Sequence, residues 1–97
     1  MKFSWDPAKS EANWRERGFD FEFASLIFDG HTLEREDERE DYGERRVIAV
    51  GRADGLELTV VYTDRVTASG RLERRIISAR RSNRHERQAY QEALKDS

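Results

Sequence analysis

The chain has 97 residues, of which 36% are hydrophobic and 39% are charged, and its formal net charge is -2. This length predicts one domain, residues 1–97, with a small core, and ten aromatic residues and two apolar strands argue against a disordered chain. The absence of cysteine excludes disulfides and thiolate zinc sites. No apolar run is long enough to span a membrane. With no signal-like start, we expect a cytoplasmic protein with no membrane partner.

The first third of the chain carries helix signals after a possible short strand at residues 2–5. Asp6 as the N-cap, Pro7 at the first helical position and Gly18 at the end predict a first helix. Its expected inward residues are Ala8, Ala12, Trp5 and Trp14. A second helix is expected from Asp20, its N-cap, to Gly30.

The middle of the chain predicts a sheet. Residues 34–43 are acidic and predict an exposed loop or a short edge strand. Three antiparallel strands are expected at RRVIAVG (45–51), LELTVVYTD (56–64) and RLERRIISAR (71–80). Asp54-Gly55 is a strong hairpin signal between the first two of them. Along residues 58–63, the even-numbered side chains face one side of the sheet and the odd-numbered ones the other, and Ile76 and Ile77 point to opposite faces. Both sheet faces should therefore be at least partly covered.

The last element is expected to be a helix. Asn83 as the N-cap and Glu86 three residues later form a capping-box signal. Its apolar side comprises Ala89, Tyr90, Ala93 and Leu94. The predicted fold class is therefore α+β, with N-terminal helices, an antiparallel β-meander of three to four strands and a C-terminal helix.

Charge is unevenly distributed along the chain. Residues 29–44 hold eight acidic residues and two arginines, whereas residues 71–87 hold seven arginines and two glutamates. In one interpretation the basic segment attracts phosphate while the acidic segment lies elsewhere. In the alternative, the two segments pair with each other across the fold.

Several motifs occur in a specific order and spacing. The pattern W-D-x-x-K-x-x-x-N is formed by Trp5, Asp6, Lys9 and Asn13. It is followed by Phe21, Glu22, Ala24, Gly51, the strand 60–63, the R-I-I-S-A-R strand 75–80, Glu86 and Tyr90. Together these residues, which cover nearly the whole chain, resemble the BrnT family of bacterial toxins.

The resemblance implies a RelE-like ribonuclease fold and an endoribonuclease that cleaves RNA and inhibits translation. It implies the toxin half of a type II toxin–antitoxin system, neutralised by a BrnA-like antitoxin with a ribbon-helix-helix region. DNA would be bound only through the antitoxin, in a complex that represses its own promoter and can form a higher-order toxin–antitoxin assembly. We expect no cofactor and no metal.

One departure from the family pattern affects the expected chemistry. The first helix of the family commonly ends in Lys-His-Gly, whereas this chain has Glu16, Arg17 and Gly18. A group that can transfer a proton is thus replaced by a permanent cation. Two alternatives to the endoribonuclease therefore stay open. One is a weak or inactive module that binds the antitoxin and regulates the promoter, and the other is a general RNA-binding domain without a partner.

Metal-free RNA cleavage needs a base, cations that hold the phosphorane charge, and an acid. Arg46, Arg75 and Arg80 are the candidates for the cations because guanidinium pairs two phosphate oxygens. The alternative for each is a structural arginine paired with a carboxylate. Lys9 is a further catalytic candidate, since a cation in the first turn opposes the helix dipole.

The relative orientation of two of these candidates depends on the strand that carries them. Arg75 and Arg80 differ in parity, so a regular strand would direct them to opposite faces. They can converge only if the strand ends or bulges near Ser78 or Ala79. Otherwise one of them would hold the N-terminal helix while the other meets phosphate.

Further arginines, two possible proton-transfer groups and four aromatic residues are the remaining candidates. Expected RNA-binding residues are Arg74, Arg81, Arg84, Arg87 and Arg17. Glu44 and His85 are possible proton-transfer groups, although exposed positions explain both; we assign no role to His31. Trp5, Trp14, Phe21 and Phe28 are expected in the core, the alternative being base stacking.

Overall fold

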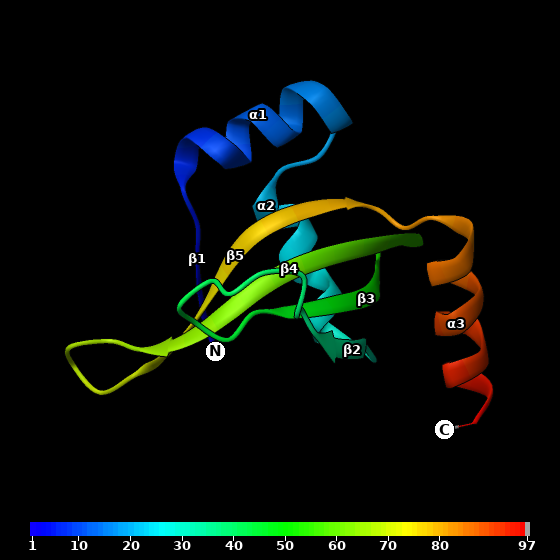
Figure 1. Cartoon of the computed structure of the whole chain (residues 1–97). Helices are drawn as coiled ribbons and strands as arrows, with labels where there is room; N and C mark the ends of the chain where they lie inside the picture. The colour runs from blue at the N-terminus through cyan, green and yellow to red at the C-terminus, as the bar shows by residue number, and fades with distance from the viewer. Residues whose placement is uncertain (97) are drawn as a thin grey trace.

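The computed structural model describes residues 1–96 and contains one five-stranded mixed sheet in the order β1-β5-β4-β3-β2 (Figure 1). The strands are β1 (Lys2–Ser4), β2 (Leu33–Glu36), β3 (Val47–Ala53), β4 (Leu56–Val66) and β5 (Leu72–Arg81). The helices are α1 (Pro7–Arg17), α2 (Phe21–Ala24), the 3-10 helix η1 (Ser25–Asp29) and α3 (Arg84–Lys95). None of the helices in this part of the chain is long and apolar enough to cross a membrane.

The α+β class is confirmed, but the sheet has five strands, not three or four, and it is not wholly antiparallel. The central meander β3-β4-β5 is antiparallel, and Asp54 and Gly55 form its first turn with positive φ values of 47° and 84°. The short strand β1 pairs with β5 in parallel. Strand β2 arises from the start of the acidic segment and pairs with β3. Both edge strands are short; a possible strand at residues 2–5 and a short edge strand within 34–43 were expected, but their pairing partners were not.

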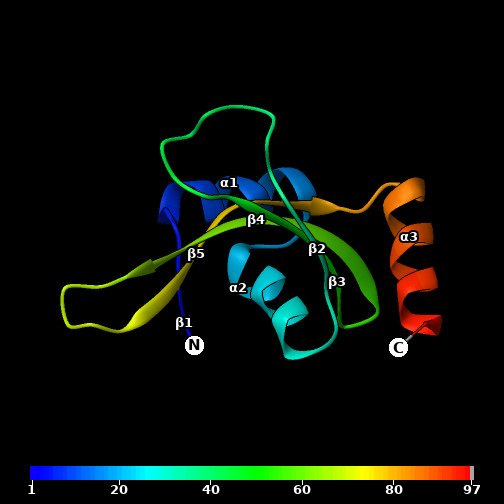
Figure 2. The ribbon, with the colours of Figure 1, turned by 60° about the horizontal axis from the view of Figure 1, so that its bottom comes forward.

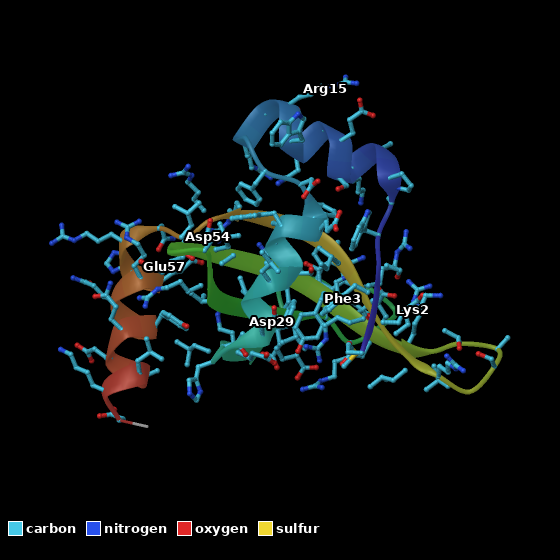
Figure 3. All side chains as sticks on the ribbon, turned by 180° about the vertical axis from the view of Figure 1, so that it is seen from behind. Lys2, Phe3, Arg15, Asp29, Asp54 and Glu57 are labelled. Carbon is cyan, nitrogen blue, oxygen red and sulfur yellow. The ribbon has the colours of Figure 1, made fainter. Side chains whose placement is uncertain are left out.

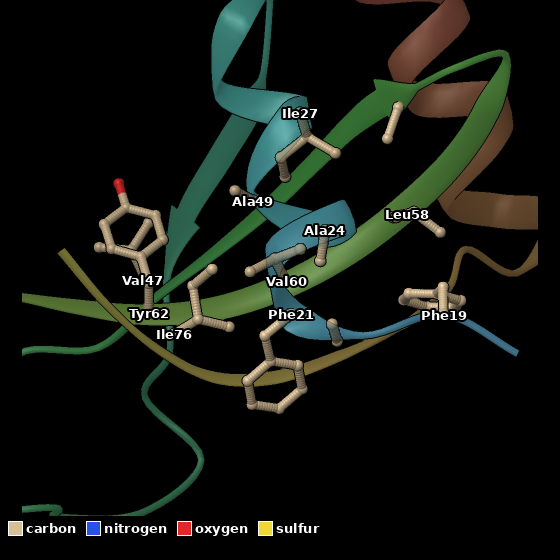
Figure 4. Close-up of a cluster of buried hydrophobic side chains, with 12 residues drawn as sticks. Phe19, Phe21, Ala24, Ile27, Val47, Ala49, Leu58, Val60, Tyr62 and Ile76 are labelled. Atoms are coloured by element: carbon tan, nitrogen blue, oxygen red, sulfur yellow. The ribbon is translucent and has the colours of Figure 1, made fainter. Parts of the chain in front are cut away.

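One face of the sheet carries the core. Helices α2 and η1 lie across it, and their apolar residues pack on the central strands (Figure 4). Ile27 of η1 is fully buried, and a Cβ at Gly51 would lie only 2.8 Å from the Cβ of Ile27. Glycine at this position therefore allows η1 to approach β3 closely. At the sheet edge, Phe3 of β1 points toward η1 and stacks on Phe28 with ring centroids 5.6 Å apart (Figure 3).

Helix α1 docks through polar side chains, so the expectation that Ala8, Ala12 and Trp14 point inward was wrong. Its buried residues are Ser10 and Asn13, whereas Ala8 and Ala12 are exposed. The Asn13 side-chain amide donates to the carbonyl of Phe19 at 2.9 Å, and the Ser10 hydroxyl accepts from the N–H of Phe21 at 3.0 Å. These bonds satisfy backbone groups at the start of α2, where apolar side chains could not.

The two tryptophans of this region differ in their surroundings. Trp5 is half-buried and packs against the core. Trp14 is 60% exposed, which the core assignment did not anticipate. Arg15, one residue on, also points away from the body of the molecule (Figure 3). Phe21 and Phe28 lie in or against the core, as expected.

The second face of the sheet is covered by α1 and by the loop that joins β2 to β3. Figure 2 shows both on one side of the sheet, with α2 and η1 on the other. Ile48, Val50 and Val61 are buried on this second face, which confirms that both faces are covered. The loop is closed by a hydrogen bond from the N–H of Asp37 to the carbonyl of Arg46, at 2.8 Å.

Helix α3 lies beyond the far end of the central strands (Figure 1). It begins with the predicted capping box between Asn83 and Glu86. Tyr90 is buried and donates a hydrogen bond of 2.9 Å to the carbonyl of His31. Ala93 is half-buried beside it, whereas Ala89 is exposed.

Candidate active site

A β-bulge decides where the arginines of β5 point. Val61 faces Ser78 and Tyr62 faces Ile76, so Ile77 is an extra residue in β5. The extra residue reverses the alternation of side chains beyond it, so residues 75 and 80 share one face although their numbers differ by five. Arg75 lies opposite Thr63, and Arg80 lies opposite Thr59. Both arginines therefore start from the same sheet face, the face covered by α1 and the loop. The bulge lies one residue before the stretch in which it was expected.

Only one of these two arginines lies in a cleft with other predicted catalytic residues. The cleft has a volume of about 110 Å³ and is lined by Asp6, Lys9, Glu44, Arg46, Arg65, Arg75, Ile76 and Ile77. This volume is small beside the roughly 300–1,000 Å³ of drug-sized ligand pockets, and it suits a phosphate group better than a base. Lys9 comes from α1, Arg46 from the end of the loop, and Arg65 and Arg75 from the paired strands β4 and β5.

The cleft has a surplus of positive charge. Its four cations face two carboxylates, Asp6 and Glu44. Asp6 accepts the N-cap hydrogen bond from the N–H of Ala8 at 2.9 Å, and Glu44 accepts from Arg46 at 3.1 Å. Arg75 is half-buried and Lys9 is exposed. Within residues 1–96, neither side chain has a carboxylate within 4.0 Å. The cleft thus holds cations whose charge no internal partner neutralises.

Arg80 is in a different state from Arg75. The Thr59 and Thr63 partners place the two arginines four strand residues apart, roughly 13 Å. The Arg80 guanidinium makes a bidentate ion pair with Glu86, at 2.7 and 2.8 Å. This pair lowers the pKa of Glu86 to about 2 and raises the pKa of Arg80. Arg80 therefore fastens the start of α3 to the end of β5.

The family of the chain is decided by comparison with known proteins. Residues 5–86 match the family model described as the ribonuclease toxin BrnT of type II toxin–antitoxin systems. The chain belongs to the BrnT family. The match includes Lys9, Arg46, Arg65, Arg75 and Arg80. No curated relative matches the chain.

Arg17, the last residue of α1, contacts both its own helix and the sheet. The Arg17 guanidinium donates to the side-chain oxygen of Asn13 at 2.9 Å and to the carbonyl of Ala79 at 3.0 Å. It thereby joins the end of α1 to β5, close to the bulge. Because guanidinium stays protonated, Arg17 offers no proton transfer. Its side chain also lines a second hollow on this side of α1, together with Lys9, Asn13 and Ile77.

Arg74, expected to bind RNA, lies on the core side of the sheet in this BrnT chain. Its guanidinium lies 4.0 Å from the Tyr62 ring centroid and 4.7 Å from that of Phe28. It also makes two hydrogen bonds to Asp64, at 2.8 and 2.9 Å, which raise its pKa. The Tyr62 hydroxyl donates to Glu34 at 2.7 Å. All of these contacts hold Arg74 within the protein.

The other basic residues of the last segment are more available. Arg81 and Arg84 are exposed, and neither has a carboxylate within 4.0 Å in the described part of the chain. Arg87 donates to the carbonyl of Ser82 at 2.8 Å. His85 is exposed in the first turn of α3. The backbone carbonyl of His31 accepts the hydrogen bond from Tyr90.

The acidic segment does not pair with the arginine-rich segment. Its ion pairs are Asp37–Arg39, Glu36–Arg45 and Glu44–Arg46, all local in sequence. Within residues 1–96, no ion pair joins residues 29–44 to residues 71–87. The acidic loop nevertheless lies on the same side of the sheet as the cleft, and it contributes Glu44. Nowhere among these residues do three metal-binding side chains gather as a candidate metal site.

Two features of the cleft were not predicted from the sequence. Arg65 was overlooked because the register of β4 against β5 was unknown. That register places Arg65 opposite Glu73 and two residues from Thr63, on the face of Arg75. The grouping of Lys9 with Arg46 was also beyond local sequence signals, because it depends on how α1 and the loop cover the sheet.

Proposed function

We propose that this BrnT-family protein is an endoribonuclease that binds a phosphodiester in the cleft of Lys9, Arg46, Arg65 and Arg75. The observation that carries the proposal is the unpaired Arg75 guanidinium beside other cations on one face of the sheet. A planar cation of this kind stabilises the charge that develops on phosphorane oxygens. The RelE-like fold implied by the resemblance agrees with such a site on the sheet, and it remains an expectation.

The reaction needs no group beyond those that line the cleft. The 2′-oxygen attacks the adjacent phosphorus as the bond to the 5′-oxygen breaks, giving a 2′,3′-cyclic phosphate and a 5′-hydroxyl. Glu44 takes the proton of the 2′-hydroxyl in this proposal, since Asp6 is engaged as a helix cap and the bond from Arg46 uses only one oxygen of Glu44 among the described residues. The Lys9 ammonium then supplies a proton to the leaving 5′-oxygen. Arg46, Arg65 and Arg75 hold the phosphate charge, while Arg80 acts through the position of α3.

The biological consequence proposed is inhibition of translation by RNA cleavage, reversed by a BrnA-like ribbon-helix-helix antitoxin. An acidic segment of that antitoxin would cover the cleft, because the cleft carries surplus positive charge. Raising the salt concentration should then slow toxin–antitoxin association markedly, in a stopped-flow measurement. An on-rate insensitive to salt would contradict electrostatic masking of the cleft.

The direct test is incubation of the purified protein with single-stranded RNA, with and without EDTA. We expect cleavage under both conditions, with products that end in a 2′,3′-cyclic phosphate and a 5′-hydroxyl. Intact RNA would contradict the proposal, and loss of cleavage in EDTA would contradict the metal-independent reaction. Boiled protein and RNA protected by 2′-O-methyl groups are the matched controls.

A second candidate is an antitoxin-binding module with little catalytic activity, and the contacts of Arg17 favour it. This arginine occupies the position of the family histidine and is engaged with Asn13 and Ala79. Replacing Arg17 with histidine tests the choice. A gain in RNA cleavage of ~10-fold or more supports a weakened enzyme. Antitoxin binding without cleavage in either variant supports the module.

A further inference from the structure

The backbone at Arg45 and Arg46, at the end of the loop of residues 37–46, is fixed by two hydrogen bonds. The N–H of Asp37 donates to the carbonyl of Arg46, and the Thr63 hydroxyl donates to the carbonyl of Arg45, both at 2.8 Å. The next residue, Val47, begins the pairing of β3 with β4 opposite Tyr62. The backbone of Arg46 is therefore fixed at the rim of the cleft, whereas its long side chain has several rotatable bonds.

Two side chains of the same loop restrict the Arg46 side chain. The guanidinium carbon lies 4.0 Å from the centroid of the Tyr42 ring. The Nε–H donates to Glu44 at 3.1 Å. In the described part of the chain, the two terminal nitrogens have no hydrogen-bond partner. One face of the guanidinium is thus covered by a ring, and its Nε edge is occupied.

The loop that carries Tyr42 also contains a buried carboxylate, Asp37. The Asp37 side chain has no exposed surface, and Arg39 donates to it at 2.8 and 2.7 Å. These bonds hold the pKa of Asp37 well below its usual range, and the Tyr42 hydroxyl contributes in the same direction. The Asp37–Arg39 bonds fix the loop in which Tyr42 lies, and the ring of Tyr42 contacts Arg46.

Without the ring, Arg46 would have a competing arrangement. A free guanidinium pairs a carboxylate through two nitrogens, and Glu44 lies within reach of it. Such a pair would turn the terminal nitrogens away from the cleft and neutralise their charge. A cation–π contact does not consume donors, so it fixes the plane of the guanidinium and leaves the terminal nitrogens for an anion.

We propose that Tyr42 is a positioning residue for Arg46, which presents its two terminal nitrogens to a phosphodiester in the cleft. This inference rests on the proposed function, because it assumes that the cleft binds an RNA phosphate. The residue that contacts the phosphate is Arg46, and Tyr42 acts through it.

The test is a double-mutant cycle on Tyr42→Leu and Arg46→Ala, with Tyr42→Phe and Arg45→Ala as controls. The readout is the Kd for a short 2′-O-methyl RNA oligonucleotide, which binds but cannot be cleaved. Arg45 is a matched control because its side chain is 73% exposed and, among residues 1–96, pairs with Glu36 alone, at 3.5 Å. The melting temperature of each variant is measured in parallel, and cleavage of unmodified RNA is measured separately.

We expect Tyr42→Leu to weaken binding by about 3- to 10-fold, the size of a cation–π contribution. Tyr42→Phe and Arg45→Ala should bind within about 2-fold of the wild type, since both keep the ring and Arg46. Tyr42→Leu should have no further effect once Arg46 is alanine. Loss of binding in Tyr42→Phe equal to that in Tyr42→Leu, or fully additive losses in the double variant, would overturn the inference.

The two proposals fail in different ways. If the wild type binds RNA and Tyr42→Leu binds it more weakly, but unmodified RNA is not cleaved, the nuclease proposal is contradicted and the positioning role is supported. Cleavage with full binding by Tyr42→Leu would support the nuclease and overturn the positioning role. A wild-type protein that neither binds nor cleaves RNA would overturn both.

Discussion

The two ends of β5 carry the same residue type on the same sheet face, yet they offer different chemistry. At one end, Arg75 lines a cleft with other cations and has no carboxylate partner among residues 1–96. At the other, Arg80 is bound in bidentate fashion by Glu86 at the start of α3. The local density of arginine thus says little about function. What distinguishes the two arginines is whether the fold supplies an internal anion.

The largest expected effect comes from removing the available arginine. Arg75→Ala should lower the rate of RNA cleavage by ~100-fold, the loss typical of one transition-state donor. Because Arg75 has no ion pair among residues 1–96, the melting temperature of the Arg75→Ala variant should stay close to that of the wild type. Single-turnover kinetics and thermal unfolding measure the two quantities, and Arg75→Lys tests whether charge alone is sufficient. A ten-degree fall in melting temperature would instead make Arg75 structural.

The matching change at the other end should act on stability. Arg80→Ala removes two charge-assisted hydrogen bonds and should lower the free energy of unfolding by ~1–2 kcal/mol, a value moderated by partial exposure. Cleavage by the folded fraction should fall less than about 10-fold, well short of the loss in Arg75→Ala. Urea unfolding followed by circular dichroism measures the change. Equal catalytic losses in the two variants would remove the difference between the ends of β5.

Acid should reduce the difference between the two ends, because it removes the negative charge that pairs with Arg80. The pKa of Glu86 is lowered to about 2, so its stabilising pair is complete above the ordinary pKa near 4.5 and is lost as the pH falls toward 2. Wild-type protein should therefore be more stable than Glu86→Gln by ~1 kcal/mol at pH 6. The difference should shrink as pH falls through this window. A constant difference between pH 6 and pH 2.5 would contradict the pair.

The smallest effect is expected beyond both ends, on α3. Arg84 is exposed and has no carboxylate partner in the part of the chain that the structure describes. Arg84→Ala should weaken RNA binding less than about 3-fold and lower the slope of log K against log salt by about 1 or less. Fluorescence anisotropy at several salt concentrations measures both. A loss as large as that in Arg75→Ala would move the RNA site to α3.

Local signals predicted the elements of this fold better than their arrangement. The caps Asp6 and Asn83 and the turn Asp54-Gly55 were recognised because each acts on its immediate neighbours. A short strand near residues 2–5 was also expected, but its parallel pairing with β5 and the polar docking of α1 were not, because both depend on partners distant in sequence. The buried polar Asn13 matched the family pattern, but its inward position ran against the expected apolar face.

The candidate site was predicted in part for the same reason. Lys9, Arg46 and Arg75 were chosen, and the structure brings them together. Arg80 and Arg74 were chosen with them, but their carboxylate partners, Glu86 and Asp64, can be identified only with the fold in hand. The bulge at Ile77 has no sequence signature, although it sets the direction of every arginine that follows it in β5.

The most direct measurement is the response of arginine Nε–Hε NMR signals to titration with a 2′-O-methyl RNA oligonucleotide. Each arginine is assigned by substitution, so the experiment locates the phosphate without depending on catalysis. We predict that the signals of Arg75 and Arg46 shift on saturation while that of Arg80 stays in place. A shift of Arg80 with Arg75 unchanged would contradict the proposed cleft.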